Sequence, residues 1–404
     1  MKIRIMKSKS TSILTRNNLL PLAFVLGLAV GATPMAQAQT FRIAHSFAGS
    51  DGANPLSSLT VAGSSLYGTT SAGGTSGNGV VFEINSSGAF AVLYSFKGGT
   101  SDGANPRGSL VIDKAGNLYG TTTAGGAYGA GTVFAVTTKG TEKVLHSFKG
   151  APGAATPEAG LVWHAGRLYG TTTAGGANGN GTVFEVSPAP KKGAPWTSEV
   201  IYSFRTGTDG ATPVAGVTFA AGKLYGTTSA GGTSGYGTIF ELTPSASGWT
   251  ENILYSFQNG DDGGVPYAGL IGDKVGNFYG GATSGGTGGG GTIFELSPGS
   301  SGWTFTVLYN IPGWSISGPF GNLFMDANGN LWGTTHCDGS PGFGTVYELT
   351  PASPYWTYTS LYVFTGSTDG NFVYSSPVFQ DGSLWGTAQD GGADSEGIVF
   401  KIAL

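Results

Sequence analysis

The chain has 404 residues and a formal net charge of −4, and it contains 73 glycines while only 10% of its residues are charged. So many glycines without an every-third-residue period exclude a collagen-like chain, and the 12% aromatic content excludes a disordered glycine-rich one. Because the sequence has no basic runs, nucleic acid and anionic membrane surfaces are poor partners, since both are bound through Lys and Arg.

The first 38 residues have the pattern of a cleavable export signal. Five basic residues precede the apolar run at 21–32, and Ala36-Gln37-Ala38 supplies a small-x-small cleavage site. The run is short for a membrane span, although a retained N-terminal anchor is the alternative. We expect cleavage after Ala38 and a secreted, periplasmic or cell-surface protein. The remaining chain has 14 Lys and Arg against 23 acidic residues, a net charge of −9, and the single Cys337 excludes an internal disulfide.

A motif that begins with Leu66-Tyr67-Gly68-Thr69-Thr70 recurs seven times. In every copy 15 residues separate its first aromatic from the aromatic of the strand that follows a glycine-rich loop, as from Tyr67 to Phe82. The copies themselves are spaced by 50 to 56 residues. The motif copies lie near residues 66–84, 118–136, 168–186, 224–242, 278–296, 331–349 and 384–402.

Each repeat contains four short runs of β-branched and aromatic residues with turn signals between them, which is typical of a propeller blade. The last repeat stops at a third strand, residues 398–402, whereas residues 43–47 resemble the fourth strands of other repeats. The sequence therefore predicts an all-β fold, a seven-bladed β-propeller of residues 39–404 with four strands per blade. We expect the N-terminal strand to complete the last blade and close the ring, which removes exposed edges.

Two repeated residues within the strands call for a packing explanation. A glycine in mid-strand, such as Gly68, costs roughly 0.5–1 kcal/mol against alanine, so we expect each one to admit an aromatic ring from the adjacent blade. A glutamate recurs in most third strands, at Glu83, Glu185, Glu241 and equivalent positions. We expect these carboxylates to accept hydrogen bonds between blades, because a glycosidase needs one matched pair and the repeats offer no means of choosing it.

The Leu-Tyr-Gly-Thr-Thr, Gly-Gly and Gly-Thr-Val-Phe-Glu elements together resemble the GloVer tandem repeat of exported bacterial proteins. The resemblance covers all seven units and implies an exported, surface-displayed protein. It implies no activity and no catalytic residues.

An Asp-Gly turn joins most repeats to the next, on the same face as the glycine-rich loops. The aspartates are Asp51, Asp102, Asp209, Asp262 and Asp369. Such carboxylates commonly accept hydrogen bonds from their own turn. The alternative is a ring of carboxylates that binds cations or sugar hydroxyls, although aspartates on separate blades are far apart for one ion.

The sixth repeat departs from the pattern. Its glycine-rich loop contains His336, Cys337, Asp338 and Phe343, and its preceding turn contains Trp314 in place of an Asp-Gly pair. These residues fall short of a zinc ligand set. Repeat drift is the simple interpretation, and a local asymmetric site is the alternative. Tyr128 and Tyr236 add loop aromatics on the same face, suited to stacking on a glycan or a peptide.

The sequence thus favours a non-enzymatic exported monomer that binds an extracellular polysaccharide or a cell-surface protein around the channel. An extracellular hydrolase or lyase with its site at the channel mouth, and a purely structural surface module, are the alternatives, because propellers host all three. The sequence identifies no catalytic residue, no metal site and no cofactor.

Overall fold

Short strands separated by glycine-rich turns build the whole of the part that the computed structural model describes, which is residues 39–404 except 190, 192–193, 206, 314–316 and 354. Within these residues every regular element is a strand, and no helix occurs. The expected export signal, residues 1–38, lies outside the described residues.

Seven of the antiparallel sheets are the blades, each read here from its innermost to its outermost strand, and two further sheets have two strands each. Blade 1 contains β2 (Thr60–Ala62), β3 (Ser65–Thr70), β4 (Val80–Ile84) and β5 (Phe90–Ser95). Blade 2 contains β7 (Val111–Ile112), β8 (Asn117–Gly125), β9 (Thr132–Thr137) and β10 (Glu142–Ser147), with β6 (Gly103–Pro106) also paired to β8. Blade 3 contains β12 (Val162–His164), β13 (Arg167–Thr172), β15 (Thr182–Ser187) and β16 (Thr197–Ser203).

The remaining blades repeat this order. Blade 4 contains β18 (Thr218–Ala220), β19 (Lys223–Thr228), β21 (Thr238–Ser245) and β22 (Gly248–Ser256). Blade 5 contains β23 (Ile271–Gly272), β24 (Phe278–Ala282), β25 (Gly289–Gly299) and β26 (Gly302–Pro312). Blade 6 contains β27 (Phe324–Met325), β28 (Leu331–Thr334), β29 (Thr345–Thr350) and β30 (Thr357–Val363). Blade 7 contains β31 (Val378–Gln380), β32 (Ser383–Ala388), β33 (Ile398–Ala403) and β1 (Thr40–Ser46).

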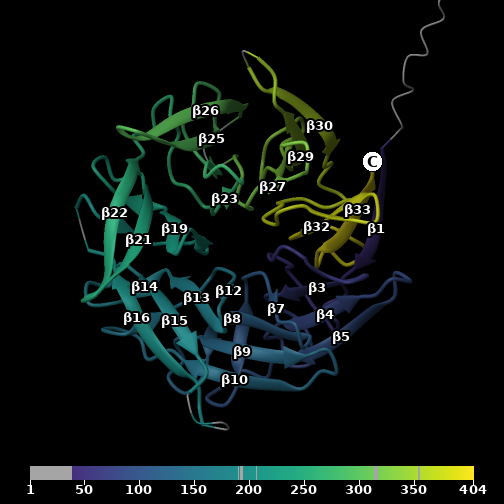
Figure 1. Cartoon of the computed structure of the whole chain (residues 1–404). Helices are drawn as coiled ribbons and strands as arrows, with labels where there is room; N and C mark the ends of the chain where they lie inside the picture. The colour runs from purple at the N-terminus through teal and green to yellow at the C-terminus, as the bar shows by residue number, and fades with distance from the viewer. Residues whose placement is uncertain (1–38, 190, 192–193, 206, 314–316, 354) are drawn as a thin grey trace, which may run out of the picture. The chain divides into compact units, whose positions relative to one another are not determined.

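The predicted seven-bladed propeller, closed by its N-terminal strand, is confirmed. Strand β1 pairs antiparallel with β33 from Thr40 opposite Ala403 to Ser46 opposite Ile398. The purple N-terminal strand therefore lies against the yellow C-terminal strands in the ring (Figure 1).

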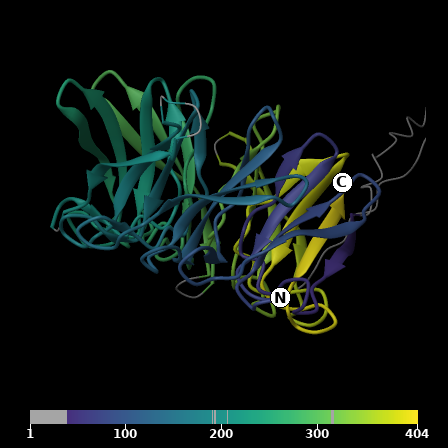
Figure 2. The same cartoon turned by 90° about the horizontal axis from the view of Figure 1, so that it is seen from below.

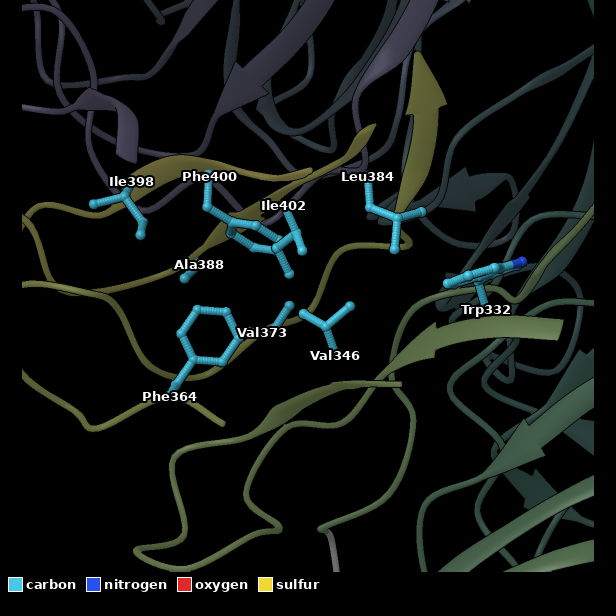
Figure 3. Close-up of a cluster of buried hydrophobic side chains, with 9 residues drawn as sticks. All are labelled: Trp332, Val346, Phe364, Val373, Leu384, Ala388, Ile398, Phe400 and Ile402. Atoms are coloured by element: carbon cyan, nitrogen blue, oxygen red, sulfur yellow. The ribbon is translucent and has the colours of Figure 1, made fainter. Parts of the chain in front are cut away.

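Seven clusters of buried apolar side chains hold the ring together, one at each boundary between neighbouring blades. The cluster between blades 6 and 7 brings Val346 and Phe364 of one blade against Phe400 and Ile402 of the other (Figure 3). Burying one such side chain stabilises the fold by roughly 1.5–3 kcal/mol. The core is therefore a set of seven interfaces, not one central mass.

The aromatic ring beside each motif glycine comes from the same blade, so our expectation of an adjacent blade was wrong. A Cβ on Gly68 would lie 2.4 Å from the ring of Phe82, which is its directly paired residue on β4. The same holds from Gly120 with Phe134 to Gly386 with Phe400. The aromatic side chain lies over the glycine opposite it in the sheet and also packs in a cluster between blades, as Phe82 does between blades 7 and 1.

The repeated glutamates also act within their own blades, which corrects the second packing expectation. Tyr67 donates to Glu83 (3.2 Å) and Tyr225 donates to Glu241 (3.0 Å), each from the paired strand of the same sheet. In blade 3, Arg167 takes the place of the tyrosine as the partner of Glu185 at 2.8 Å. These carboxylates hold neighbouring strands of one blade together.

Alternating strand directions place the glycine-rich loops and the Asp-Gly turns at one end of the strands, the glycine-loop face. The hairpins between third and fourth strands lie at the opposite end, so the strands run between two loop-bearing faces (Figure 2). Short pairings fasten the turn segment before a blade to the glycine-rich loop of that blade. One joins β17 (Gly210–Ala211), at an Asp-Gly turn, to β20 (Ala230–Gly231), and another joins β11 (Ala154–Ala155), which follows Pro152-Gly153, to β14 (Ala174–Gly175). The innermost strand of each blade begins at this face.

Candidate functional site

One residue per blade lines the mouth of the central channel on the glycine-loop face. These seven residues, the mouth ring, are Leu56, Arg107, Glu158, Val214, Tyr267, Phe320 and Tyr374. With Gln389 they surround a hollow of about 350 Å³, which lies within the range of roughly 300–1,000 Å³ that is usual for small-ligand sites.

A constrained turn aims each mouth-ring residue at the channel. In six blades the residue two positions earlier is not glycine and has a left-handed backbone, with φ between 53° and 57°. In blade 2 this residue is Asn105, whose N–H donates to the Asn78 carbonyl in the glycine-rich loop of blade 1. In blades 5 and 7 it is Val265 and Phe372, residue types for which this conformation is strained. Strain of this kind gathers at functional sites, so it directs attention to the mouth.

The first threonine of the repeated motif fixes the mouth ring from the neighbouring blade. Its hydroxyl donates to the carbonyl of the residue that directly follows a mouth-ring residue, as from Thr121 to Ala159 (2.8 Å) and from Thr171 to Ala215 (2.8 Å). Thr387 makes the corresponding bond to Ser57 across the ring closure at 3.0 Å. The conserved chemistry of the repeat therefore supports the variable residues of the mouth.

A cavity of about 220 Å³ is lined by the same seven mouth-ring residues and by the residues that follow them along the innermost strands, many of them serine, glycine or alanine. Blade-to-blade hydrogen bonds cross its wall, from the Ser376 N–H to Ser58 Oγ (2.7 Å) and from the Ser58 N–H to Ser109 Oγ (3.2 Å). On the other side the Gly269 N–H donates to Asn322 Oδ1 at 2.7 Å. These bonds make the channel wall a rigid base for the mouth.

Aromatic side chains occupy one side of the mouth. Tyr267 and Phe320 have ring centroids 4.7 Å apart, and Phe320 and Tyr374 have theirs 5.1 Å apart. The His336 ring packs behind them, with its centroid 4.7 Å from Phe320, 4.5 Å from Tyr374 and 4.9 Å from Phe372. Tyr267, Phe320 and Tyr374 are called the aromatic arc below.

A charged pair occupies the other side. Arg107 Nη1 lies 3.4 Å from Glu158 Oε2, and both side chains remain partly exposed, at 48% and 30%. A pair so open to solvent contributes little to stability. Its donors and acceptors are therefore free to exchange partners with a ligand in the hollow.

Two titratable groups at or behind the aromatic side, Tyr374 and Cys337, have a raised pKa. Burial raises the pKa of the Tyr374 phenol. Burial and the Asp338 carboxylate raise the pKa of the Cys337 thiol, whose Sγ lies 2.7 Å from His336 Nδ1. A nucleophile or a general base needs a lowered pKa or a deprotonated form near neutral pH, so neither group is prepared for such a role.

The five predicted aspartates hold their own turns. The carboxylate of Asp102 accepts hydrogen bonds from the Tyr94 hydroxyl (2.8 Å) and from the backbone N–H groups of Lys97 and Gly103, both at 2.7 Å. Asp209, Asp262 and Asp369 each accept a tyrosine hydroxyl and a backbone N–H in the same way, and Asp51 accepts from His45. The five aspartates are not among the residues that line the mouth.

Of the other predicted residues, the structure brings only His336 into contact with the mouth. Asp338 is buried, accepts hydrogen bonds from Thr335 and Thr345, and has a pKa raised by burial. Phe343 packs against the core between blades 6 and 7. Trp314 lies outside the described residues.

The exposed loop aromatics Tyr128 (59% exposed) and Tyr236 (38% exposed) lie on the glycine-rich loops of blades 2 and 4, away from the mouth.

Sequence reasoning missed all seven mouth-ring residues and the whole of their arrangement. A signal was present in six repeats, where the residue after the turn proline changes from leucine to arginine, glutamate, valine, tyrosine and phenylalanine while the residue that follows it stays small. In the seventh repeat Val373 takes the place of the proline before Tyr374. Searched across the described part of the chain, no group of three His, Cys, Asp or Glu residues could hold a metal ion. The same residues include no helix long and apolar enough to cross a membrane.

A family model described as the Gloeobacter/Verrucomicrobia repeat matches residues 27–221 and 191–400. No curated protein matches the chain.

Similar solved structures share the propeller architecture at low sequence identity, so they show the fold alone. A putative 6-phosphogluconolactonase from Bacteroides uniformis is 14% identical, with a TM-score of 0.53 over 80% of this chain and 88% of that one. A PL25 ulvan lyase bound to -[GlcA(1-4)Rha3S]- is 10% identical, with a TM-score of 0.52 over 89% and 95%. An ancestral GH74 enzyme is 11% identical, with a TM-score of 0.57 over 87% of this chain and 48% of its own.

Proposed function

We propose that this chain, which belongs to the Gloeobacter/Verrucomicrobia repeat family, binds a polysaccharide at the channel mouth. The observation that carries the proposal is the mouth ring itself, where the aromatic arc faces the Arg107–Glu158 pair across a hollow of about 350 Å³. The glycine and the aromatic ring of the motif repeat in all seven blades, whereas the mouth-ring residue differs in size and charge from blade to blade.

The two sides of the mouth match the two sides of a sugar. A pyranose ring presents C–H groups on its faces and hydroxyls around its edge. The aromatic arc offers flat apolar surface for the faces, while the Arg107 guanidinium donates to hydroxyl oxygens and the Glu158 carboxylate accepts from hydroxyl protons. Hydrogen bonds to ionised groups are stronger than neutral ones, so this pair adds both affinity and orientation.

Binding is placed first because the mouth combines flat aromatic surface with an exposed ion pair, the two kinds of group that a sugar contacts. The second candidate is an enzyme, a polysaccharide lyase or hydrolase. It is favoured because Tyr374 and His336 lie on one side of the mouth and Arg107 lies on the other. The ulvan lyase of similar fold carries a bound oligosaccharide, so a propeller of this shape is compatible with either function. A structural surface module is the third possibility, in which the mouth has no ligand.

We further propose that the protein acts outside the cytoplasm, at the cell surface or in the medium. The support is the leader pattern of residues 1–38, with its basic segment, apolar run and Ala36-Gln37-Ala38. N-terminal sequencing of the exported protein tests this point, and the expected first residue is Gln39.

A glycan array probed with the full chain, followed by calorimetry on each glycan that binds, tests the proposed function. Phe320→Ala, Tyr374→Ala and Arg107→Gln should each weaken binding about tenfold or more, because a few central residues carry most of the energy of an interface. Tyr128→Ala removes an exposed aromatic away from the mouth and should leave affinity unchanged.

Trp314→Ala belongs in the same series, because the sequence indicates Trp314 as a binding residue. If no glycan binds, or if the mouth variants bind as tightly as the parent, the proposal is overturned. Shortened or unsaturated products formed from a bound glycan would assign the protein to the enzyme class instead.

A further inference from the structure

On the face opposite the mouth, tryptophans close four of the seven grooves between blades. Each tryptophan comes from the hairpin between the third and fourth strands and packs on the motif tyrosine of the preceding blade. Ring centroids lie 6.0 Å apart for Trp196 and Tyr119, 6.4 Å for Trp249 and Tyr169, 6.2 Å for Trp303 and Tyr225, and 6.4 Å for Trp356 and Tyr279.

The groove between blade 7 and blade 1, where the purple strands follow the yellow ones, has no such tryptophan (Figure 1). The hairpin of blade 1 is short, and Gly88 stands near the place that the tryptophan has in blade 4. A cavity of about 200 Å³ remains there. Its wall, the seam pocket, includes Leu66, Ile84, Gly88, Gln380, Trp385 and Lys401.

Polar atoms in this wall lack the partners that other blades supply. In blade 4 the motif tyrosine donates to the third-strand glutamate, and in blade 6 Trp332 Nε1 donates to Asp326 at 3.4 Å. Blade 7 has Lys401 in place of the glutamate, with Nζ 4.9 Å from the Trp385 ring centroid. Among the described residues, Trp385 Nε1 and Gln380 Oε1 are buried without a hydrogen-bond partner, and Gln380 is only 8% exposed. Buried groups left unpaired are costly, so blade 7 lacks a stabilising contact that blades 4 and 6 have at this position.

We propose that the seam pocket binds the side chain of a tryptophan in a peptide segment of a partner protein. The fold itself supplies the precedent, since four equivalent grooves hold an indole from the chain's own hairpins. Tryptophan is the residue that contributes most often to the centre of protein interfaces.

N-acetyl-tryptophanamide, titrated into the full chain by calorimetry, is the probe. Saturable binding at one site is expected, whereas N-acetyl-leucinamide should bind about tenfold more weakly or not at all. Absence of saturable binding overturns the proposal. Binding of methyl glucopyranoside in place of the tryptophan amide would also overturn it and would assign the pocket to a sugar.

A hairpin exchange supplies the matched control. Residues 85–89 are replaced by residues 243–250 of blade 4, which keeps the strand register because Ile84 pairs with Phe90 as Leu242 pairs with Glu251. The grafted tryptophan should fill the pocket and abolish probe binding, while the same graft carrying Trp249→Ala should retain it. Equal binding by both grafts would contradict the proposal.

A second variant tests the proposal even if the grafts do not fold. Trp249→Ala at its native position empties the equivalent groove between blades 3 and 4, where Tyr169 remains as the platform. The probe should then bind at two sites per chain. A stoichiometry that stays at one would show that an open groove of this kind does not select tryptophan, and the proposal would fail.

Discussion

In six of the seven blades the repeated motif has a threonine whose hydroxyl donates to the backbone carbonyl directly after a mouth-ring residue of the next blade, whereas blade 5 has Gly281 in its place. The threonine is repeated, but the mouth-ring residue beside it is not. Thr227 donates to the carbonyl of Ala268, which directly follows Tyr267 of the mouth. The threonine is completely buried, whereas Tyr267 is 37% exposed. Buried positions of a ring must satisfy the same geometry seven times, while exposed positions at its centre meet a single ligand. Residues that repeat from blade to blade therefore hold the propeller together, whereas the residues that differ between blades are the ones expected to contact a ligand.

Removing the closing strand β1 should cause the largest loss of stability in the repeated frame, the buried residues that recur from blade to blade. Deletion of residues 39–48 eliminates β1 together with Phe47, which is fully buried. Loss of one buried phenylalanine alone costs about 3–5 kcal/mol, so we expect a loss above about 4 kcal/mol in urea unfolding. Ile43→Thr on the exposed side of the same strand is the control and should stay within about 0.5 kcal/mol. An unchanged midpoint for the deletion would contradict the importance of closure.

Crowding a motif glycine should come next. A Cβ at Gly226 would lie 2.6 Å from Phe240 Cζ, so Gly226→Ala should destabilise the protein by about 1–3 kcal/mol through overpacking. The double variant with Phe240→Leu should lose less than the sum of the two single losses, because the ring that clashes is then absent. Strict additivity in chemical unfolding would show that the glycine has another role.

Two outer-strand glutamates interrupt the frame and should make stability depend on pH. Phe305 stacks on Tyr255 with centroids 4.0 Å apart, but the equivalent contacts in two other blades use Glu142 and Glu251. Burial first, and then the nearby Asp102 and Asp209 carboxylates, raise their pKa values to about 7 and about 8.

Since the folded-state pKa values lie above those of the unfolded chain, this contribution is complete below about pH 4.5. It is lost as the pH rises through 7 to 8. After allowance for solvent screening we expect a loss on the order of 1–2 kcal/mol between pH 5 and pH 9. The variants Glu142→Gln and Glu251→Gln should each make the melting temperature depend less on pH. If the melting temperature of the parent protein does not fall as the pH rises, the two glutamates do not contribute to stability in this way.

The variants with the smallest expected effect compare the repeated, buried threonines directly with the mouth ring. Thr227→Val keeps the side-chain shape but removes the bond to the Ala268 carbonyl, and should cost about 1–2 kcal/mol. Val214→Thr makes the opposite exchange at the mouth and should change stability by less than about 0.5 kcal/mol. Equal losses from both variants, measured by urea unfolding, would show that the mouth is part of the structural frame.

The fold could be predicted from the sequence because a constant 15-residue spacing and a split last repeat leave few other architectures. The side chains that contact Gly68 and Glu83 could not be predicted, because the sequence pattern of a strand does not tell whether a side chain packs within its own sheet or against the next sheet. The mouth was missed for a different reason. Leu56 and Tyr374 carry no motif and face the channel only because a left-handed residue turns the chain two positions earlier. Of the proposed site residues that the structure describes, a set that leaves out Trp314, only His336 reaches the mouth, through its ring contacts with Phe320 and Tyr374.

The pairing of β1 with β33 also sets the order in which the molecule can be completed. The Ala393 N–H donates to Ser46 Oγ across 347 positions of sequence, so the first strand to be synthesised waits for the last. Contacts between residues so distant in sequence form late, because the entropy of bringing them together must be paid before they contribute. Until then both strands are unpaired edges that other chains could join. The ring therefore depends on a final, slow joining step, during which protection from aggregation matters most.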